Sequence, residues 1–306
     1  MDYHKPILVT GSPRSGTSWA GRMFSQAPFV RYVHEPFNIS GRPCHCGIRF
    51  KYWFHYLSPK TGPLFESHLR HTIFPSFSRI ALINSVTEIT QTKRIQPLSN
   101  YLQSYLSHRV VVKDPIAVFS AETLAKLFDM DVIVLIRHPA AIVNSYKALN
   151  WSHPFSHFLS QTELMEEHLF PFRNEIEDFA KEDYEIVDQI ALLWKLIHYM
   201  ILKFQKTNSH WVFVRYEDLV LDPSEGFRKI FEQVKLPFSE RTQAAIRAHS
   251  LRNPEQNTTV PYAIKRNPHQ VASKWKKSLT ANEVYRVQKR VEPISSAFYS
   301  EQDWNE

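Results

Sequence analysis

A glycine- and serine-rich turn near the start of the chain is the first stretch whose residue types could do chemistry. The segment KPILVTGSPRSGTSW (residues 5–19) reads as a short apolar strand, a turn of small residues and the start of a helix. A Walker A loop, G-x-x-x-x-G-K-[ST], has the same layout and binds phosphate through backbone N–H groups. Gly11 and Gly16 fit that spacing, but Thr17 stands where the lysine is expected. The turn is therefore predicted to bind an anion, with Arg14 supplying the positive charge.

A second segment, VIVLIRHPAAIVNSY (residues 132–146), pairs with this turn. Its apolar strand ends at Arg137, and Ser145 is placed two turns into the helix that follows. Ligands of open α/β sheets bind at the carboxyl ends of the strands, so Arg137 lies where a ligand is expected. Taken singly, Arg137 is better explained as a solvated charge at a strand end, and Ser145 as a serine on a helix surface.

Two further strand ends carry groups able to move protons or bind anions. RYVHEPFN (residues 31–38) places His34 and Glu35 at one strand end, and VVVKDP places Lys113 and Asp114 at another. Alternation along a strand predicts that His34 and Glu35 point to opposite faces, so that one of them faces the site. As a base, Glu35 would need only a modestly raised pKa. A capping role for Glu35, and pairing of Lys113 with Asp114, remain structural alternatives.

Short apolar runs that alternate with helical patterns must position these groups. Runs this continuously apolar are typical of strands buried on both faces of a parallel sheet. The expected strands are residues 7–10, 30–33, 109–113, 131–137 and 211–216. The expected helices are residues 15–26, 121–128, 140–149, 187–205, 224–234 and 281–291. The fold class is thus α/β, with a central parallel sheet flanked by helices in a single domain over residues 1–306. Insertions at about 38–108 and 151–185 are expected to form the substrate side.

Composition limits the partners and the compartment. The chain has 306 residues, is 43% hydrophobic and carries a formal net charge of +7, which favours anionic ligands. No long run of lysine and arginine is present, so nucleic acid is not the expected partner. The most apolar stretch, residues 186–204, contains charged side chains and is not expected to span a membrane. Only two cysteines and no signal-peptide pattern lead us to expect a soluble, cytoplasmic protein.

No metal site is expected. Cys44 and Cys46 flank a histidine, but a tetrahedral zinc site needs a fourth ligand, and two free thiols in a loop explain the triplet better. Two spaced histidine pairs lack carboxylate or cysteine companions in a metal-site pattern: His68 with His71, and His153 with His157.

The turn and its companion segment together resemble the donor site of the sulfotransferases that use 3′-phosphoadenosine 5′-phosphosulfate (PAPS). GSPRSGTSW is similar to the 5′-phosphosulfate loop of that family, which carries lysine or arginine at the place of Arg14. VIVLIRHPAAIVNSY is similar to its 3′-phosphate segment, which implies that Arg137 and Ser145 bind the 3′-phosphate. SKWKKSLT is also family-like, and Lys274 and Trp275 would close over the nucleotide. The loop residues implied in cosubstrate binding are Ser12, Pro13, Arg14, Ser15, Gly16, Thr17, Ser18 and Trp19.

The resemblance implies a P-loop NTPase-like fold and metal-independent transfer of a sulfuryl group to an acceptor hydroxyl, leaving adenosine 3′,5′-bisphosphate. "HEPF" resembles the base segment of the carbohydrate- and protein-tyrosine-type enzymes, so Glu35 is the expected base and His34 the reserve. Lys113 would stabilise the bridging oxygen, and Arg14 the 5′-phosphate. The expected acceptor is a carbohydrate or glycoconjugate, although a phenolic or lipid hydroxyl stays open. An ATP-dependent P-loop kinase and a non-catalytic nucleotide- or polyanion-binding module are the alternatives.

Overall fold

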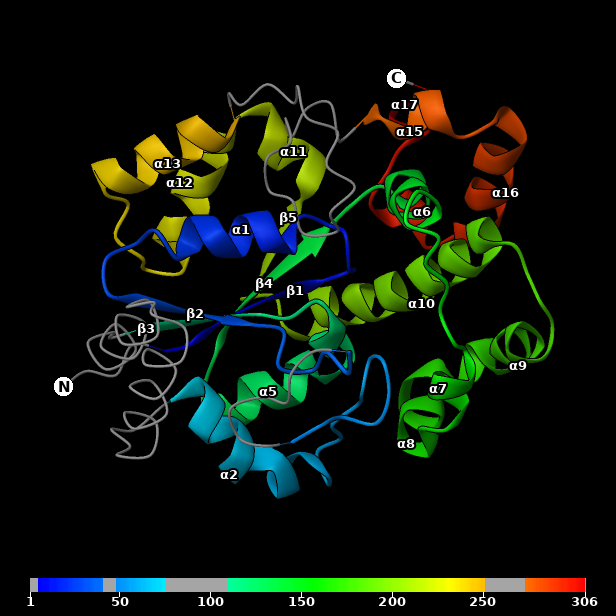
Figure 1. Cartoon of the computed structure of the whole chain (residues 1–306), viewed down its shortest axis with the longest axis horizontal. Coiled ribbons are helices and arrows are strands. Elements are labelled where there is room, and N and C mark those ends of the chain that lie inside the picture. Colours follow the sequence, from blue (N-terminus) through cyan, green and yellow to red (C-terminus); the bar gives the residue numbers. More distant parts are fainter. Residues whose placement is uncertain (1–4, 41–47, 75–108, 251–272, 306) are drawn as a thin grey trace, which may run out of the picture.

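A five-stranded sheet forms the centre of the computed structural model, which describes residues 5–40, 48–74, 109–250 and 273–305 (Figure 1). Every neighbouring pair of strands is parallel, and their spatial order is β2-β3-β1-β4-β5. All five predicted strands are present, and no end differs from the prediction by more than one residue. The strands are β1 (Ile7–Gly11), β2 (Val30–His34), β3 (Arg109–Lys113), β4 (Asp131–Ile136) and β5 (Val212–Arg215).

The topology brings the predicted functional residues to one edge of the sheet. From β1 the chain crosses to β2 on one side of the sheet, and from β3 it crosses to β4 on the other. The loops after β1 and β3 therefore diverge, and such a switch point is where open α/β sheets bind ligands. Gly11, His34, Lys113 and Ile136 are the last residues of their strands and lie at this carboxyl edge.

Helices cover both faces of the sheet (Figure 1). The α1, α12 and α13 helices lie on one face, and α2, α5 and α10 lie toward the other. No helix in the described part of the chain is long and apolar enough to cross a membrane. The α-helices are α1 (Thr17–Phe24), α2 (Gly62–Ile73), α5 (Ala121–Phe128), α6 (Pro139–Lys147), α7 (Ser156–Leu159), α8 (Thr162–Leu164), α9 (Arg173–Lys181), α10 (Ile186–Thr207), α11 (Tyr216–Leu221), α12 (Pro223–Gln233), α13 (Glu240–Ser250), α15 (Trp275–Ser278), α16 (Ala281–Val291) and α17 (Glu301–Asn305). The short 3-10 and π segments are η1 (Ile116–Ser120), η2 (Met165–Leu169), η3 (Phe170–Phe172) and η4 (Ser295–Ala297).

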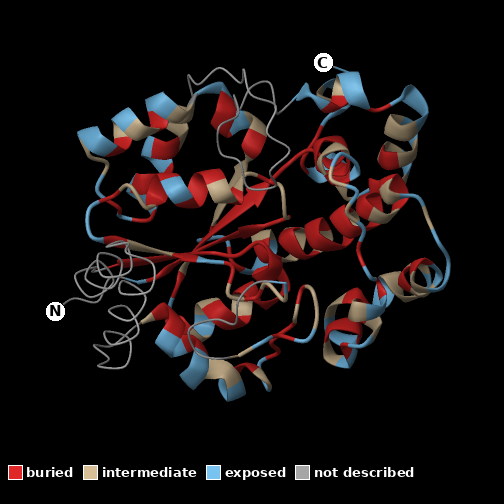
Figure 2. Ribbon diagram, in the orientation of Figure 1, coloured by how far each residue is buried: buried red, intermediate tan, exposed pale blue. Residues whose placement is uncertain are grey.

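Alternate residues of the central strand, β1, pack into two separate hydrophobic cores. Ile7 and Val9 of β1 pack with α1 and α12, whereas Leu8 packs in the larger core that includes α10. The central strands β1, β3 and β4 and the α10 helix are buried along most of their length (Figure 2). Because a parallel sheet must be covered on both faces, this double core explains why the strands read as continuous apolar runs.

The described parts of the two predicted insertions pack against each other. The Trp53 N–H donates to His157 Nδ1 at 3.0 Å, and the Tyr56 N–H donates to Gln161 Oε1 at 2.8 Å. Phe50, in the first insertion, stacks on Phe37 with ring centroids 4.0 Å apart, which joins this layer to the loop after β2. Cys44 and Cys46 lie outside the described residues.

Candidate donor and proton-transfer site

The loop after β1 folds tightly because two glycines remove steric conflicts. A Cβ at Gly11, where φ is +132°, would lie 2.2 Å from the carbonyl oxygen of Leu135. A Cβ at Gly16, where φ is +94°, would lie 2.5 Å from the ring of Tyr216. The Ser15 N–H donates to the Ser12 carbonyl at 3.1 Å, closing the turn directly before α1. The predicted strand–turn–helix arrangement is therefore confirmed.

The loop retains free capacity for an anion. The first turn of α1 contains no acidic residue, so its positive end is not compensated by a nearby carboxylate. The Ser15 hydroxyl is buried and has no hydrogen-bond partner within the described residues. A buried hydroxyl without a partner is costly, and a phosphate or sulfate oxygen would satisfy it. These features fit an anionic ligand with phosphate or sulfate oxygens.

The two predicted anion-binding segments contact each other directly. Arg14, at φ +71°, donates from Nε to the Ser145 Oγ at 2.9 Å. Arg137 donates from Nη1 to the Arg14 carbonyl at 2.6 Å. Arg14 is more than a hundred residues from Arg137 and Ser145 in the sequence. The parallel pairing of β1 with β4 brings the two segments together. One compact cationic site results.

The Arg137 side chain and backbone are both held by neighbours. The guanidinium lies over the Tyr216 ring, with its carbon 4.6 Å from the ring centroid. The Trp194 indole N–H, on α10, donates to the Arg137 carbonyl at 2.8 Å. Arg137 is only 5% exposed, so burial limits its motion and its hydration. A guanidinium held in this way suits bidentate phosphate binding.

Glu35 and Lys113 form a buried ion pair at the ends of β2 and β3. Lys113 Nζ contacts Glu35 Oε1, and the Asn38 side-chain amide donates to Glu35 Oε2 at 2.8 Å. Lys113 is fully buried and Glu35 is 9% exposed. The aliphatic part of Lys113 lies against α1, where a Cβ at Gly21 would come 3.1 Å from it. The pair therefore adjoins the helix that begins at the phosphate loop.

The expectation that His34 and Glu35 point to opposite faces is wrong. Strand β2 ends at His34, and Glu35 adopts a φ of +44°, so the alternation of a strand no longer applies. The His34 Nε2 consequently lies 3.8 Å from Glu35 Oε2. The His34 side chain is about half exposed, whereas the Glu35 carboxylate is buried beside Lys113.

Asp114 ties the strands of the site together. Its buried carboxylate accepts the N–H of Phe37 at 2.7 Å and the N–H of Ile116 at 2.9 Å. Its backbone N–H donates to the Val9 carbonyl at 2.9 Å. The alternative in which Lys113 pairs with Asp114 is therefore not the observed arrangement, because the Lys113 ammonium pairs with Glu35 and Asp114 accepts backbone N–H groups instead.

The charges of this group shift each other's protonation. Burial would raise the pKa of Glu35, but the Lys113 ammonium and its hydrogen bond outweigh this effect and lower it. A modestly raised pKa would suffice for a base, whereas in this arrangement the pKa of Glu35 is lowered. Burial lowers the pKa of Lys113, with Glu35 opposing the shift. Burial, followed by the Glu35 charge, raises the pKa of Asp114 to about 7.

Three other residues that were expected to bind the cosubstrate differ in burial and in their contacts. Trp19 is buried, with its ring edge-on to Phe227 at 5.0 Å, and its indole N–H has no partner among the described residues. Trp275 is buried and stacks on His138, the residue after Arg137, at 4.8 Å. Lys274 is exposed directly before α15. The structure thus places Trp275 behind the Arg137 loop, in contact with protein.

Sequence reasoning missed two residues that contact the site. Asn38 binds Glu35, and the Trp151 ring lies 5.9 Å from the guanidinium carbon of Arg14. Asn38 follows Glu35 by three residues, a spacing that permits contact across a turn. Trp151 carries no such local signal, since it meets Arg14 only through the fold.

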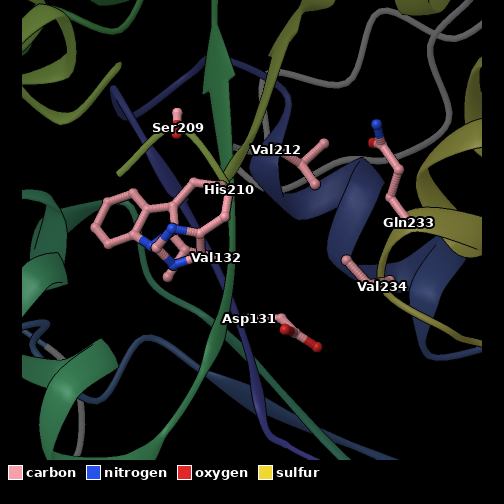
Figure 3. A pocket seen from close by; sticks show the side chains of 8 residues that line it. Asp131, Val132, Ser209, His210, Val212, Gln233 and Val234 are labelled. Atoms are coloured by element: carbon pink, nitrogen blue, oxygen red, sulfur yellow. The ribbon is translucent and has the colours of Figure 1, made fainter. Parts of the chain in front are cut away.

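A hollow lies at the amino-terminal ends of the strands, at the first residues of β4 and β5 (Figure 3). It holds about 230 Å³ and includes Asp131 and His210, but no lysine or arginine lines it. This hollow does not suit an anion. Within the described residues, no group of three or more histidine, cysteine, aspartate or glutamate side chains is arranged to hold a metal ion.

Comparison with known proteins gives a consistent result. The model of the sulfotransferase family matches residues 6–240. No curated protein matches the sequence significantly. The sulfotransferase domain from the curacin biosynthetic pathway superposes with a TM-score of 0.53 at 16% identity, covering 96% of each chain, and this likeness shows the fold.

Two other solved structures are less alike in shape. The sulfotransferase domain of the Synechococcus PCC 7002 olefin synthase is 20% identical over 98% of each chain, with a TM-score of 0.45. Sulfotransferase STF9 from Mycobacterium avium is 15% identical, over 97% of this chain and 78% of the other, with a TM-score of 0.46. The fold is the P-loop-like α/β fold shared with the domain from the curacin biosynthetic pathway. By the family match over residues 6–240, the chain belongs to the sulfotransferase family.

Proposed function

We propose that this sulfotransferase takes its sulfuryl group from PAPS and transfers it to a hydroxyl group of a carbohydrate or glycoconjugate. The observation that carries the proposal is the direct contact between the two anion-binding segments, Arg14 with Ser145 and Arg137 with the Arg14 carbonyl. PAPS carries one anionic group on each side of its ribose, and one site with two adjoining cationic segments suits that pattern. Thr17 in place of the Walker lysine argues against an ATP-dependent kinase.

In the proposed reaction the acceptor oxygen attacks sulfur while the bond from sulfur to the 5′-phosphate oxygen breaks. The proton of the acceptor hydroxyl passes to the Glu35 carboxylate. The electron pair of the broken bond remains on the 5′-phosphate of adenosine 3′,5′-bisphosphate. Arg14 and the N–H groups at the start of α1 would stabilise the charge that develops on this leaving group.

Lys113 links the two halves of this reaction. It pairs with Glu35 and, at the end of the strand beside β1, borders the helix that follows the phosphate loop. As its ammonium turns toward the departing phosphate, Glu35 loses its counter-ion, so its pKa rises and it becomes a better proton acceptor. This exchange of partners reconciles the lowered pKa of Glu35 with a role as base. His34 is the reserve base, and burial, then the Lys113 charge, lowers its pKa.

The aromatic layer near Glu35 suits an acceptor that carries a ring, whether a sugar or a phenol. Phe50 stacks on Phe37, two residues after Glu35, and Tyr52 and Trp53 of the same layer are partly exposed. Exposed aromatic rings stack on sugar rings, and they would also accept a phenolic acceptor. A panel containing both classes therefore decides the acceptor.

The test is transfer of radiolabelled sulfate from PAPS to a panel of glycans and phenols, with detection of the mass of one added SO3 group. We expect labelling of glycans without added metal. Glu35→Gln should abolish transfer and leave affinity for adenosine 3′,5′-bisphosphate nearly unchanged, while the surface variant Glu122→Gln should behave as wild type. Stabilisation by Mg-ATP and not by adenosine 3′,5′-bisphosphate would overturn the proposal in favour of a kinase. Binding without transfer to any acceptor would favour a non-catalytic module.

A further inference from the structure

The last part of the chain returns to the sheet edge that carries Arg137. After α16, the segments η4 and α17 bring the chain back near α6 and α15 (Figure 1). Tyr299 and Trp304, on this returning segment, are buried. Their rings meet the residue that follows Arg137, so the C-terminal segment contacts the proposed donor site from behind.

His138 is caged by aromatic rings. The Trp275 ring stacks on it at 4.8 Å, and the rings of Tyr299 and Trp304 meet it edge-on at 4.8 and 4.4 Å. Neither ring nitrogen has a hydrogen-bond partner within the described residues, and burial lowers the pKa of His138 to about 3. The imidazole is therefore a neutral packing group, and the cage fixes the backbone directly after Arg137.

Glu217 joins three separate elements at this point. Its Oε1 accepts the backbone N–H of His138 at 3.0 Å, and its Oε2 accepts the hydroxyl of Tyr299 at 3.0 Å. Glu217 itself follows Tyr216, the ring that lies under the Arg137 guanidinium. One carboxylate thus connects the loop after β4, the start of α11 and the C-terminal segment.

A second connection reinforces the first. Arg215 donates from Nη2 to Asp303 Oδ1 at 2.6 Å, and its guanidinium carbon lies 4.6 Å from the centroid of the Tyr299 ring. Arg215 directly precedes Tyr216. The C-terminal segment consequently contacts both sequence neighbours of Tyr216, Arg215 and Glu217.

We propose that Glu217 and Tyr299 are positioning residues that set the affinity of the site for a 3′-phosphate. Through the His138 N–H they fix the backbone next to Arg137, and through α11 they fix the Tyr216 ring beneath its guanidinium. They touch no donor atom themselves. This inference rests on the proposed function, because it assumes that Arg137 binds the 3′-phosphate.

The test is calorimetric titration of Tyr299→Phe with adenosine 3′,5′-bisphosphate and with adenosine 5′-monophosphate, which lacks the 3′-phosphate. The variant keeps the ring that packs on His138 and Arg215 and removes only the hydroxyl. We expect its affinity for the bisphosphate to fall about fivefold, as for one lost hydrogen bond, and that for the monophosphate by less than about twofold. The control Tyr285→Phe, at an exposed tyrosine on α16, should change neither.

A double-mutant cycle separates positioning from general destabilisation. In an Arg137→Ala background, Tyr299→Phe should have no further effect on bisphosphate affinity. An equal loss of affinity for both nucleotides, or an undiminished effect without Arg137, would overturn the inference. If Tyr299→Phe does not fold, Glu217→Gln is titrated with the same two nucleotides, and the same selective loss of bisphosphate affinity is expected. If the wild-type protein binds the two nucleotides equally, the proposed function fails, and it does so before any variant is compared.

Discussion

Lys113→Met tests the buried ion pair on which the proton-transfer site depends. The substitution keeps most of the side-chain volume but removes the ammonium that pairs with Glu35. Among the described residues, the Asn38 amide and the more distant His34 imidazole then remain as side-chain neighbours of the carboxylate. Breaking a buried pair by removing one partner costs about 3–5 kcal/mol of stability, because the remaining charge stays buried without compensation. We expect a loss of this size at pH 7.5, measured by urea unfolding.

The loss should depend on pH in a defined direction. In the wild type the pKa of Glu35 is below its ordinary value of 4.5, so its stabilising contribution is present above that value and is lost as the pH falls through the folded-state pKa. In the variant the same carboxyl is buried without Lys113, so its pKa rises above the ordinary value. The destabilisation should then shrink by about 1.4 kcal/mol for each pH unit over which the variant carries protonated Glu35.

Two matched variants complete the experiment. Lys126→Met removes an exposed partner of Glu122 and should cost less than about 1 kcal/mol. The double variant Lys113→Met with Glu35→Gln removes both charges and should recover most of the lost stability. A destabilisation by Lys113→Met that stays below about 1 kcal/mol, or that is the same at pH 5 and pH 7.5, would refute the reasoning.

Three other predictions address the remaining parts of the site. Gly16→Ala should lower the free energy of unfolding by about 1–3 kcal/mol in urea titrations, because φ is +94° and the new methyl group meets Tyr216; a change near zero would contradict the loop geometry. Arg137→Ala should weaken binding of adenosine 3′,5′-bisphosphate about 10- to 100-fold in calorimetry and that of the 5′-monophosphate much less; equal weakening would remove Arg137 from the 3′-phosphate site. Asp114 has a pKa raised to about 7, so the folded state gains stability from its proton below the unfolded value of 3.8 and loses it as the pH rises through 7. Asp114→Asn should flatten this part of the stability profile between pH 5 and 8, and an unchanged slope in urea titrations would count against it.

The sheet could be predicted because each strand can be recognised from its own short stretch of sequence. Strands buried on both faces need apolar side chains at every position, and β3 and β4 show such runs in the sequence. The turn after β1 was likewise readable, since Gly11 and Gly16 occupy positions where a side chain does not fit. Placing Arg14 and Arg137 at one edge followed from the parallel topology.

The contacts within the site could not be predicted in the same way. The bond from Arg14 to Ser145 depends on how two distant segments meet, and no local pattern encodes it. The wrong prediction that His34 and Glu35 point to opposite faces has a local cause. Glu35 has a positive φ and lies beyond the end of β2, so the alternation of a strand does not extend to it. Glu217 likewise carries no local signal of its contacts, since its partner Tyr299 is 82 residues away.

The most direct test of the central claim is titration of the wild-type protein with adenosine 3′,5′-bisphosphate and adenosine 5′-monophosphate in the absence of divalent metal. The claim is that Arg14, Ser145 and Arg137 form one site for a nucleotide phosphorylated on both sides of its ribose. We predict binding of the bisphosphate that is at least about tenfold tighter than that of the monophosphate, as expected for one charge-assisted phosphate contact. Equal affinity for the two nucleotides, or no binding of the bisphosphate, would contradict it.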